Sequence, residues 1–208
     1  MPDPLDAVSP LDGRYAGRTA PLRAYASEAA LMRARVHVEV EYLIALSDLE
    51  ATPLELDETD RSTCRALYEE FEAEDAQLVK QIETSGTADY AATNHDVKAI
   101  EYFIRERLPA DLDRVHPWIH FGLTSEDVNN LAYRLLIGPA VEEVLRPRLV
   151  TTRTAIADLA RDHRAAVMLA RTHGQPATPT TFGKEMAVFV GRLDRATDRI
   201  EAADAALA

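Results

Sequence analysis

Two histidines of this sequence lie in stretches where an imidazole could be held for proton transfer. His173 belongs to RTHGQPATP (171–179), which gathers one glycine and two prolines between two helical patterns, and His95 belongs to TNHD (93–96). Imidazole is the side chain that most readily gains and loses a proton near neutral pH, so it suits general acid–base catalysis. Because a stiff loop holds a group in place, we predict a catalytic role for His173 first and for His95 second.

Polar residues also gather where predicted helices begin, in TNHD, in TSED (124–127) and near DGRY (12–15). The N-terminus of a helix has free backbone N–H groups and the positive end of the helix dipole, which favour phosphates and carboxylates. Three such ends together with Arg14 would form a receptor for a polyanionic small molecule. Taken alone, TSED is an ordinary capping sequence. The remaining histidines are best explained as structural residues: His37, His116, His120 and His163.

The composition argues against several classes of protein. A net charge of −12 argues against nucleic-acid binding, which needs a basic surface. No apolar stretch is long enough to span a membrane, and the N-terminal residues lack the pattern of a secretory signal. The single Cys64 rules out an internal disulfide and fits a reducing cytoplasm. No histidine pair has metal-site spacing and no glycine-rich phosphate loop is found, so no metal or cofactor is predicted.

Apolar residues recur mostly at spacings of three and four, and period-2 alternation is almost absent, which predicts an all-α fold. Residues 1–22 are rich in proline and glycine and predict a loop. Helices are then expected to begin near Ser27, near Asp57 (in one or two pieces), after Asn94 as N-cap, and after Thr124 or Ser125 as N-cap. The last of these should restart at Gly138-Pro139, kink at Pro147 and end near His163.

The final segment predicts one long helix. It starts at Pro179, a favourable first helical residue, and its apolar positions then alternate in steps of four and three. A seam of this length needs partner helices. We therefore expect the chain to be the N-terminal portion of a longer protein, or to receive these partners from other subunits. The seam consists of Phe182, Met186, Phe189, Leu193, Ala196, Ile200, Ala203 and Leu207.

Four motifs follow one another along the chain: SPLDGRY (9–15), TNHDVKAIEYF (93–103), IHFGLTSEDVNNL (119–131) and RTHGQPATPTTFGKEMA (171–187). In this order they resemble the adenylosuccinate lyases of the fumarase/aspartase superfamily, and the resemblance covers the whole chain. Stretches like TSxD and THGQPA are typical of the superfamily at large. The first two motifs are typical of the purine enzyme in particular.

The resemblance implies a fold, an assembly and a reaction. The fold is a small N-terminal helical lobe at 1–115, followed at 116–208 by the first part of a central helical bundle. The assembly is a cytoplasmic homotetramer with active sites shared between subunits. The reaction is β-elimination of fumarate from adenylosuccinate to give AMP, and from the succinylated aminoimidazole carboxamide ribotide in purine biosynthesis. It needs no cofactor or metal.

The resemblance also implies roles for single residues. His173 matches the family's general acid, which protonates the leaving nitrogen, and His95 would orient the substrate or support charge. Thr124 and Ser125 match residues that receive a succinyl carboxylate. The other matches are substrate contacts: Arg14, Tyr15, Asn94, Asp96, Thr172 and Gln175. The family's base is a serine in an SSxMPxKxNP-like loop. That loop has no counterpart here, so we expect the 208-residue chain alone to be inactive.

Two alternatives remain open at this point. The first is another lyase of the superfamily, such as one acting on argininosuccinate, against which the nucleotide-specific motifs argue. The second, from a different class, is a non-catalytic helical assembly module that keeps the fold without the reaction. The retention of every expected polar position in these motifs argues against it.

Overall fold

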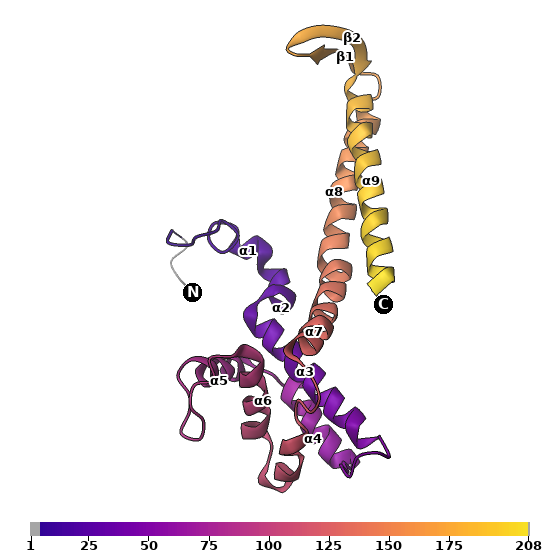
Figure 1. Ribbon diagram of the computed structural model, residues 1–208. Helices are drawn as coiled ribbons and strands as arrows, with labels where there is room; N and C mark the ends of the chain where they lie inside the picture. The colour runs from indigo at the N-terminus through magenta and orange to yellow at the C-terminus, as the bar shows by residue number, and fades with distance from the viewer. Residues whose placement is uncertain (1–4, 208) are drawn as a thin grey trace. The chain divides into compact units, whose positions relative to one another are not determined.

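In the computed structural model, which describes residues 5–207, the chain forms two compact units, Met1–Ile137 and Gly138–Ala208 (Figure 1). Helices make up most of the regular structure, and the predicted all-α class is confirmed. The exception among the described residues is a two-stranded antiparallel hairpin in the second unit. The division at 115/116 implied by the family resemblance stays a prediction about the complete protein.

The first unit begins with short helical turns. They are α1 (Ala16–Thr19), the 3-10 turn η1 (Ala20–Leu22) and α2 (Arg23–Ala26). Pro21 lies at the start of η1, where its missing N–H costs no helical hydrogen bond. The loop predicted for residues 1–22 is therefore correct only for the described residues that precede Ala16.

The long helix α3 (Glu28–Ser47) is the centre of the first unit. The hydroxyl of Ser27 accepts a hydrogen bond from the Ala30 N–H at 3.1 Å, which confirms the predicted helix start. The helices α4 (Glu58–Glu69), α5 (Ala73–Thr84) and α6 (Asp96–Arg107) pack against α3, and the 3-10 segment η2 (Ala110–Trp118) follows α6. The predicted second helix is thus formed in two pieces, α4 and α5.

Two groups of buried apolar side chains hold the first unit together. The larger group joins α3, α4, α5, α6 and η2. The smaller group joins α3 to the first turn of α6 and to α7 (Ser125–Pro139). It consists of Ala30, Ala34 and Val38 of α3, Val97 of α6, and Val128, Ala132 and Leu136 of α7. Burial of a large apolar side chain contributes roughly 1.5–3 kcal/mol. The first turns of α6 and α7, which carry predicted site residues, are therefore anchored to α3.

Beyond α7 the chain stays helical with a local change of pitch. A π-helical segment, η3 (Ala140–Leu145), connects α7 to α8 (Arg146–Asp162). Pro139 and Pro147 flank this segment, and neither supplies a backbone N–H to a regular α-helical ladder. The predicted disturbance at these prolines takes the form of a π-helix, and the predicted end near His163 is confirmed, since His163 is the C-cap of α8.

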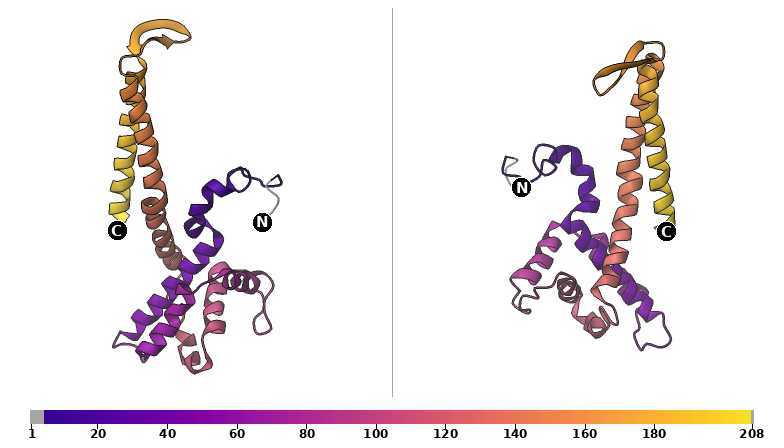
Figure 2. Two further views of the ribbon diagram at one scale, coloured as in Figure 1. Left: turned by 180° about the vertical axis from the view of Figure 1, so that it is seen from behind. Right: turned by 45° about the horizontal axis from the view of Figure 1, so that its top comes forward.

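The second unit consists of two long helices and the hairpin that joins them. From the hairpin, α9 (Phe182–Leu207) runs back beside α8, as both Figure 1 and Figure 2 show. The guanidinium of Arg153 donates two hydrogen bonds to the carboxylate of Asp194, at 2.8 and 3.2 Å. Arg146 pairs with Glu201 at 3.0 Å. These contacts fix the register of the two helices.

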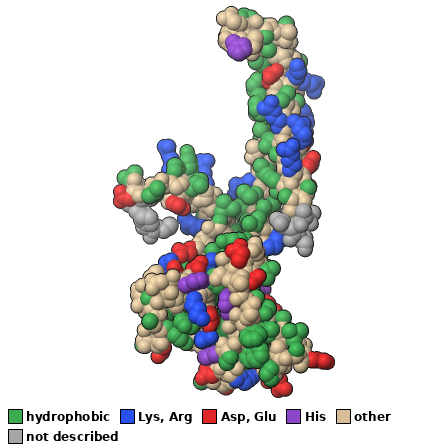
Figure 3. Space-filling view, in the orientation of Figure 1, with side chains coloured by type: hydrophobic (Ala, Val, Ile, Leu, Met, Phe, Trp, Pro, Cys, Tyr) green, Lys and Arg blue, Asp and Glu red, His purple; other side chains and the backbone are tan. Residues whose placement is uncertain are grey.

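The predicted start of the last helix at Pro179 is wrong. Residues 175–181 pair as a strand, so α9 begins only at Phe182. Contact with α8 partly covers the predicted seam, whereas Phe189 remains 48% exposed, and the side chain of Leu207 lies outside the described residues. Figure 3 shows hydrophobic side chains beside Lys and Arg along this helical pair. Within residues 5–207, no helix has the length and apolar character needed to cross a membrane.

Candidate active site

The stretch predicted as a stiff loop around His173 is a β-hairpin. Strand β1 (Val167–Thr172) pairs with β2 (Gln175–Thr181), and Thr172 lies opposite Gln175. His173 and Gly174 are therefore the two central residues of the turn, with φ angles of 48° and 79°. Positive φ at both positions defines a type I′ turn, in which asparagine followed by glycine is the favoured pair. The hairpin thus holds the His173 backbone in a left-handed conformation at its tip.

The imidazole of His173 is exposed, and it has no hydrogen-bond partner among residues 5–207. The neighbouring side chains of Thr172 and Gln175 are exposed as well. The register of β1 and β2 shifts by one residue between Leu169 and Arg171, which is a bulge that strengthens the local twist. Predicted site residues thus cluster at the hairpin tip, with their polar groups available to a ligand.

The base of the hairpin is fixed to the helix pair by a close backbone contact. The N–H groups of Phe182 and Gly183 donate to the carbonyls of Ala166 and His163, at 2.9 and 3.1 Å. A Cβ atom added at Gly183 would lie 2.4 Å from the carbonyl oxygen of Ala160. Only glycine permits this approach. The geometry of the junction therefore sets the direction in which the hairpin leaves the helices.

The Asn94–Asp96 segment forms the N-terminus of α6, and its cap differs from the prediction. His95, not Asn94, is the N-cap: its Nδ1 accepts a hydrogen bond from the Lys98 N–H at 3.3 Å. Asn94 precedes it in the left-handed region, with φ of 49°. An Nδ1 that accepts a hydrogen bond carries no proton, so the neutral ring of His95 carries its proton on Nε2. Because the ring is half exposed, this N–H is available as a donor.

The carboxylate of Asp96 is engaged within the protein. It accepts a hydrogen bond from the Val97 N–H at 2.9 Å and pairs with the guanidinium of Arg35 at 2.7 Å. Partial burial alone would raise the pKa of Asp96, but Arg35 and the Val97 N–H outweigh it, and the pKa lies below its ordinary value. Asp96 is therefore an ionised residue that anchors the first turn of α6.

Of the two residues predicted as the possible cap, Thr124 and Ser125, Thr124 is the cap. The Thr124 hydroxyl accepts from the Asp127 N–H at 3.4 Å, and the Asp127 carboxylate accepts from the N–H and the hydroxyl of Thr124, both at 2.7 Å. These hydrogen bonds, led by the one from the Thr124 N–H, lower the pKa of Asp127. The hydroxyl of Ser125 has no hydrogen-bond partner within the described part of the chain. Ser125 is thus the residue of this pair that is free to meet a ligand.

Arg14 and Tyr15 lie at the end of a turn that leads into α1. The Tyr15 N–H donates to the Pro10 carbonyl at 2.8 Å, and both side chains are exposed. The guanidinium of Arg18 lies 5.9 Å from the centre of the Tyr15 ring. No hydrogen bond between described residues joins Arg14 or Tyr15 to the Asn94 or Ser125 segments.

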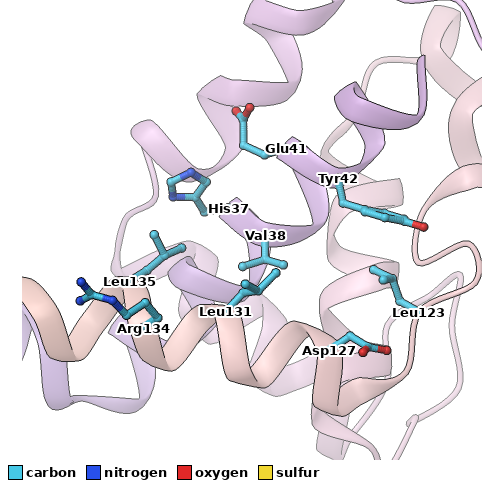
Figure 4. A pocket seen from close by; sticks show the side chains of 9 residues that line it. All are labelled: His37, Val38, Glu41, Tyr42, Leu123, Asp127, Leu131, Arg134 and Leu135. Carbon is cyan, nitrogen blue, oxygen red and sulfur yellow. The ribbon is translucent and has the colours of Figure 1, made fainter. Parts of the chain in front are cut away.

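Two hollows of the first unit lie near these segments. A cavity of about 360 Å³ is lined by Asn94, His95 and Asp96 together with Arg35 and residues of α3 and α5. An apolar pocket of about 320 Å³ lies between α3 and α7, where Val38 lies against Leu131, while Tyr42 lies on the side of Leu123 (Figure 4). No predicted site residue lines the apolar pocket. The cavity at the start of α6 is therefore the one of the two that predicted site residues line, and the carboxylates of Glu28 and Glu83 line it as well.

The structure also reveals buried polar residues that the sequence patterns did not single out. Arg35 bonds to both Asp96 and Asn129, and Glu39 bonds to His120, which we expected to be merely structural. These contacts join the segments of Asn94 and Ser125 through the same helix. The available signal was a pair of opposite charges one turn apart, which places both side chains on one face of α3.

Solved structures of two enzymes share the fold of this chain. A fumarate lyase from Mesorhizobium sp. BNC1 matches with a TM-score of 0.67 and 26% identity, over 88% of this chain and 39% of that one. A 3-carboxy-cis,cis-muconate lactonizing enzyme from Pseudomonas putida shares the fold, with a TM-score of 0.66 and 21% identity, over 90% of this chain and 40% of that one.

The family follows from the sequence comparison. The model of the lyase family matches residues 13–208, and the chain belongs to this family. The adenylosuccinate lyase of Dictyostelium discoideum is 47% identical over 204 residues, which cover 95% of this chain and 42% of the relative. That of Escherichia coli K12 is 42% identical over 199 residues, covering 92% and 41%. The chain thus spans less than half the length of the curated relatives it matches.

Proposed function

We propose that the complete protein cleaves adenylosuccinate to fumarate and AMP, and cleaves the succinylated aminoimidazole carboxamide ribotide in the same way. The observation that carries this proposal is the 47% identity to an adenylosuccinate lyase over 204 residues, a span that covers 95% of the chain. The exposed imidazole at a rigid turn and the polar residues at the helix N-termini suit a reaction that needs an acid and anion contacts.

In the proposed reaction, a base removes a proton from the carbon of the succinyl group that lies β to the nitrogen. The electron pair forms the C=C bond of fumarate while the C–N bond breaks, and His173 supplies the proton that the leaving nitrogen takes up. His173 must then be protonated before the step. We assign the base to a serine loop outside these 208 residues, so the chain alone is proposed to be inactive.

The binding roles follow from the groups that are available. Ser125, with the N–H groups of the first turn of α7, would receive a succinyl carboxylate, and Thr124 would hold that turn through its cap. His95 would donate its Nε2–H to the substrate. Arg14 offers a fork of donors that suits phosphate or carboxylate. Tyr15, Asn94, Thr172 and Gln175 are proposed as further contacts.

We also propose a cytoplasmic homotetramer that works without a cofactor. The exposed apolar residues Val188 and Phe189 of α9, 44% and 48% exposed, support contact with further helices. The sequence has a single cysteine, Cys64, and this low cysteine content supports a reducing compartment.

The test is an assay of the complete protein with a panel of substrates. Adenylosuccinate and the succinylated ribotide should each release fumarate, and argininosuccinate should not. If the protein cleaved only argininosuccinate, it would instead be another lyase of the superfamily, and the proposed substrates would be wrong. A folded tetramer that cleaves none of the three would contradict the proposed reaction.

Alanine substitutions at Thr124 and Ser125 should have different effects, because only Thr124 caps α7. Thr124→Ala should lower the free energy of unfolding by about 1 kcal/mol through loss of the cap. Ser125→Ala should leave stability nearly unchanged but lower kcat/KM by roughly 10-fold or more, through loss of a hydrogen bond to a charged group. Thermal denaturation and steady-state kinetics of the complete protein measure both. If Ser125→Ala keeps normal kinetics, its proposed contact with the carboxylate is wrong.

A further inference from the structure

Two opposite charges are buried one helical turn apart on α3. Arg35 is 6% exposed and Glu39 is 1% exposed, among neighbours that are mostly apolar. Burying an ionised group is unfavourable unless it is paired and hydrogen-bonded. The role of these two side chains therefore depends on the groups that pair with them.

Arg35 links the first residue of α6 to the second turn of α7. One guanidinium nitrogen lies 2.7 Å from the carboxylate of Asp96, at the start of α6, and Nε donates to Asn129 Oδ1 of α7 at 2.9 Å. The planar guanidinium fixes the directions of both contacts. Arg35 thereby ties the helix end that carries His95 to the one that carries Ser125.

Glu39 holds the segment that leads into α7. Its Oε1 lies 2.6 Å from Nδ1 of His120, and a single proton lies between them. Its Oε2 is buried without a hydrogen-bond partner among the described residues. Burial raises the pKa of Glu39, although the contact with His120 opposes this shift. A buried carboxylate with one unsatisfied oxygen is unfavourable for stability, so stability alone does not explain why Glu39 occupies this position.

The segment held by Glu39 has an unusual backbone. His120 has φ of 60° and Gly122 has φ of 73°, both in the left-handed region. The hydroxyl of Tyr42, also on α3, donates to the carbonyl of Phe121 at 3.0 Å. A non-glycine residue keeps such a conformation only when its surroundings fix it. Glu39 and Tyr42 supply that support immediately before Thr124.

We propose that Arg35 and Glu39 are positioning residues, which hold the N-termini of α6 and α7 in the mutual geometry that the substrate requires. The inference rests on the proposed function of His95 and Ser125 as substrate contacts. Neither Arg35 nor Glu39 needs to touch the substrate. Their charges act through Asp96, Asn129 and His120.

A second charge cluster on α3 provides a matched control. Glu41 accepts two hydrogen bonds from Arg65, at 2.8 and 3.0 Å, and one from the Tyr68 hydroxyl at 2.8 Å. This cluster ties α3 to α4, and it contacts neither the Asn94 nor the Ser125 segment. Glu41→Gln and Arg65→Met therefore remove charge-assisted hydrogen bonds from the same helix, at side chains that are about a third exposed (35% and 36%), without affecting the proposed geometry.

The first measurement does not depend on activity. Hydrogen–deuterium exchange of the complete protein should show faster exchange at 119–126 in Glu39→Gln, and at both 93–98 and 124–130 in Arg35→Met. Glu41→Gln and Arg65→Met should leave these peptides unchanged. Unchanged exchange at 119–126 in folded Glu39→Gln would overturn the proposal for Glu39. If Glu39→Gln does not fold, His120→Asn tests the same contact, because asparagine tolerates positive φ.

The second measurement is kinetic. Glu39→Gln and Arg35→Met should lower kcat/KM by about 10²-fold, the scale of a small misplacement of a substrate-positioning group. The two control variants should stay within about threefold. The double variant Glu39→Gln/His120→Asn should lose no more kcat/KM than the more damaging of the two single variants, because both substitutions remove the same contact between Glu39 and His120. Equal kinetic losses in test and control variants would overturn the proposal in favour of general stability.

The two measurements separate this proposal from the proposed function. If the wild-type protein cleaves no succinylated nucleotide, the proposed function fails, and the exchange data still decide whether α3 holds the two segments. If the wild type is active and the exchange and kinetics of Arg35→Met match those of Arg65→Met, only the positioning role of Arg35 fails.

Discussion

Replacing His173 by asparagine in the complete protein is expected to lower kcat by about 10²-fold or more, while the hairpin keeps its structure. His173 and Gly174 form a type I′ turn, and asparagine followed by glycine is the preferred pair for that turn. The substitution therefore removes the imidazole without straining the backbone. A loss of rate can then be assigned to the missing proton donor.

The measurement compares kcat and KM of His173→Asn with those of the wild type and of a control on the same hairpin. Val167→Thr is suitable, because Val167 lies at the base of β1 and is 81% exposed. The control should show wild-type kinetics. Substrate should still bind to His173→Asn, so KM should change much less than kcat. A variant that turns over at nearly the normal rate would remove His173 from the catalytic step.

The helices of this protein were predictable because their signals are local. Ser27 and Thr124 cap helices through contacts within three residues, so residue type and spacing are sufficient to place the helix starts. The hairpin gives no such signal. Residues 171–179 are exposed throughout, so no buried face imposes alternation on the sequence. Pro179 also suits the first turn of a helix, and this local preference led to the wrong start.

Site residues could be predicted where a short sequence motif indicates their role. They could not be predicted where the role depends on residues far away in the sequence. The motif around Asn94 pointed to the right helix end, but the cap proved to be His95, one residue later. The roles of Arg35 and Glu39 depend on Asn129 and His120, which are 94 and 81 residues away in sequence. A buried charge can be suspected from an apolar pattern, but its partner is known only once the chain has folded.

A substitution at Gly183 is expected to lower both the stability and the activity of the complete protein. In Gly183→Ala the new methyl group would lie 2.4 Å from the carbonyl oxygen of Ala160 and 2.6 and 2.7 Å from backbone atoms of Arg164. All three are backbone atoms, so the end of α8 and the turn that follows it must move away from α9. Overpacking of this kind costs typically 1–3 kcal/mol in stability. The displaced junction should also misdirect the hairpin, so kcat of the complete protein should fall together with the melting temperature.

Gly191 provides the matched control for this prediction, because it lies on the same helix. A Cβ atom at Gly191 would meet only a guanidinium nitrogen of Arg195, at 3.6 Å, which is an ordinary contact. Gly191→Ala should therefore stabilise the protein by roughly 0.5–1 kcal/mol, through the higher helix propensity of alanine. Circular dichroism during thermal unfolding measures both changes. If Gly183→Ala were as stable and as active as Gly191→Ala, the close contact between α8 and α9 would not be what directs His173.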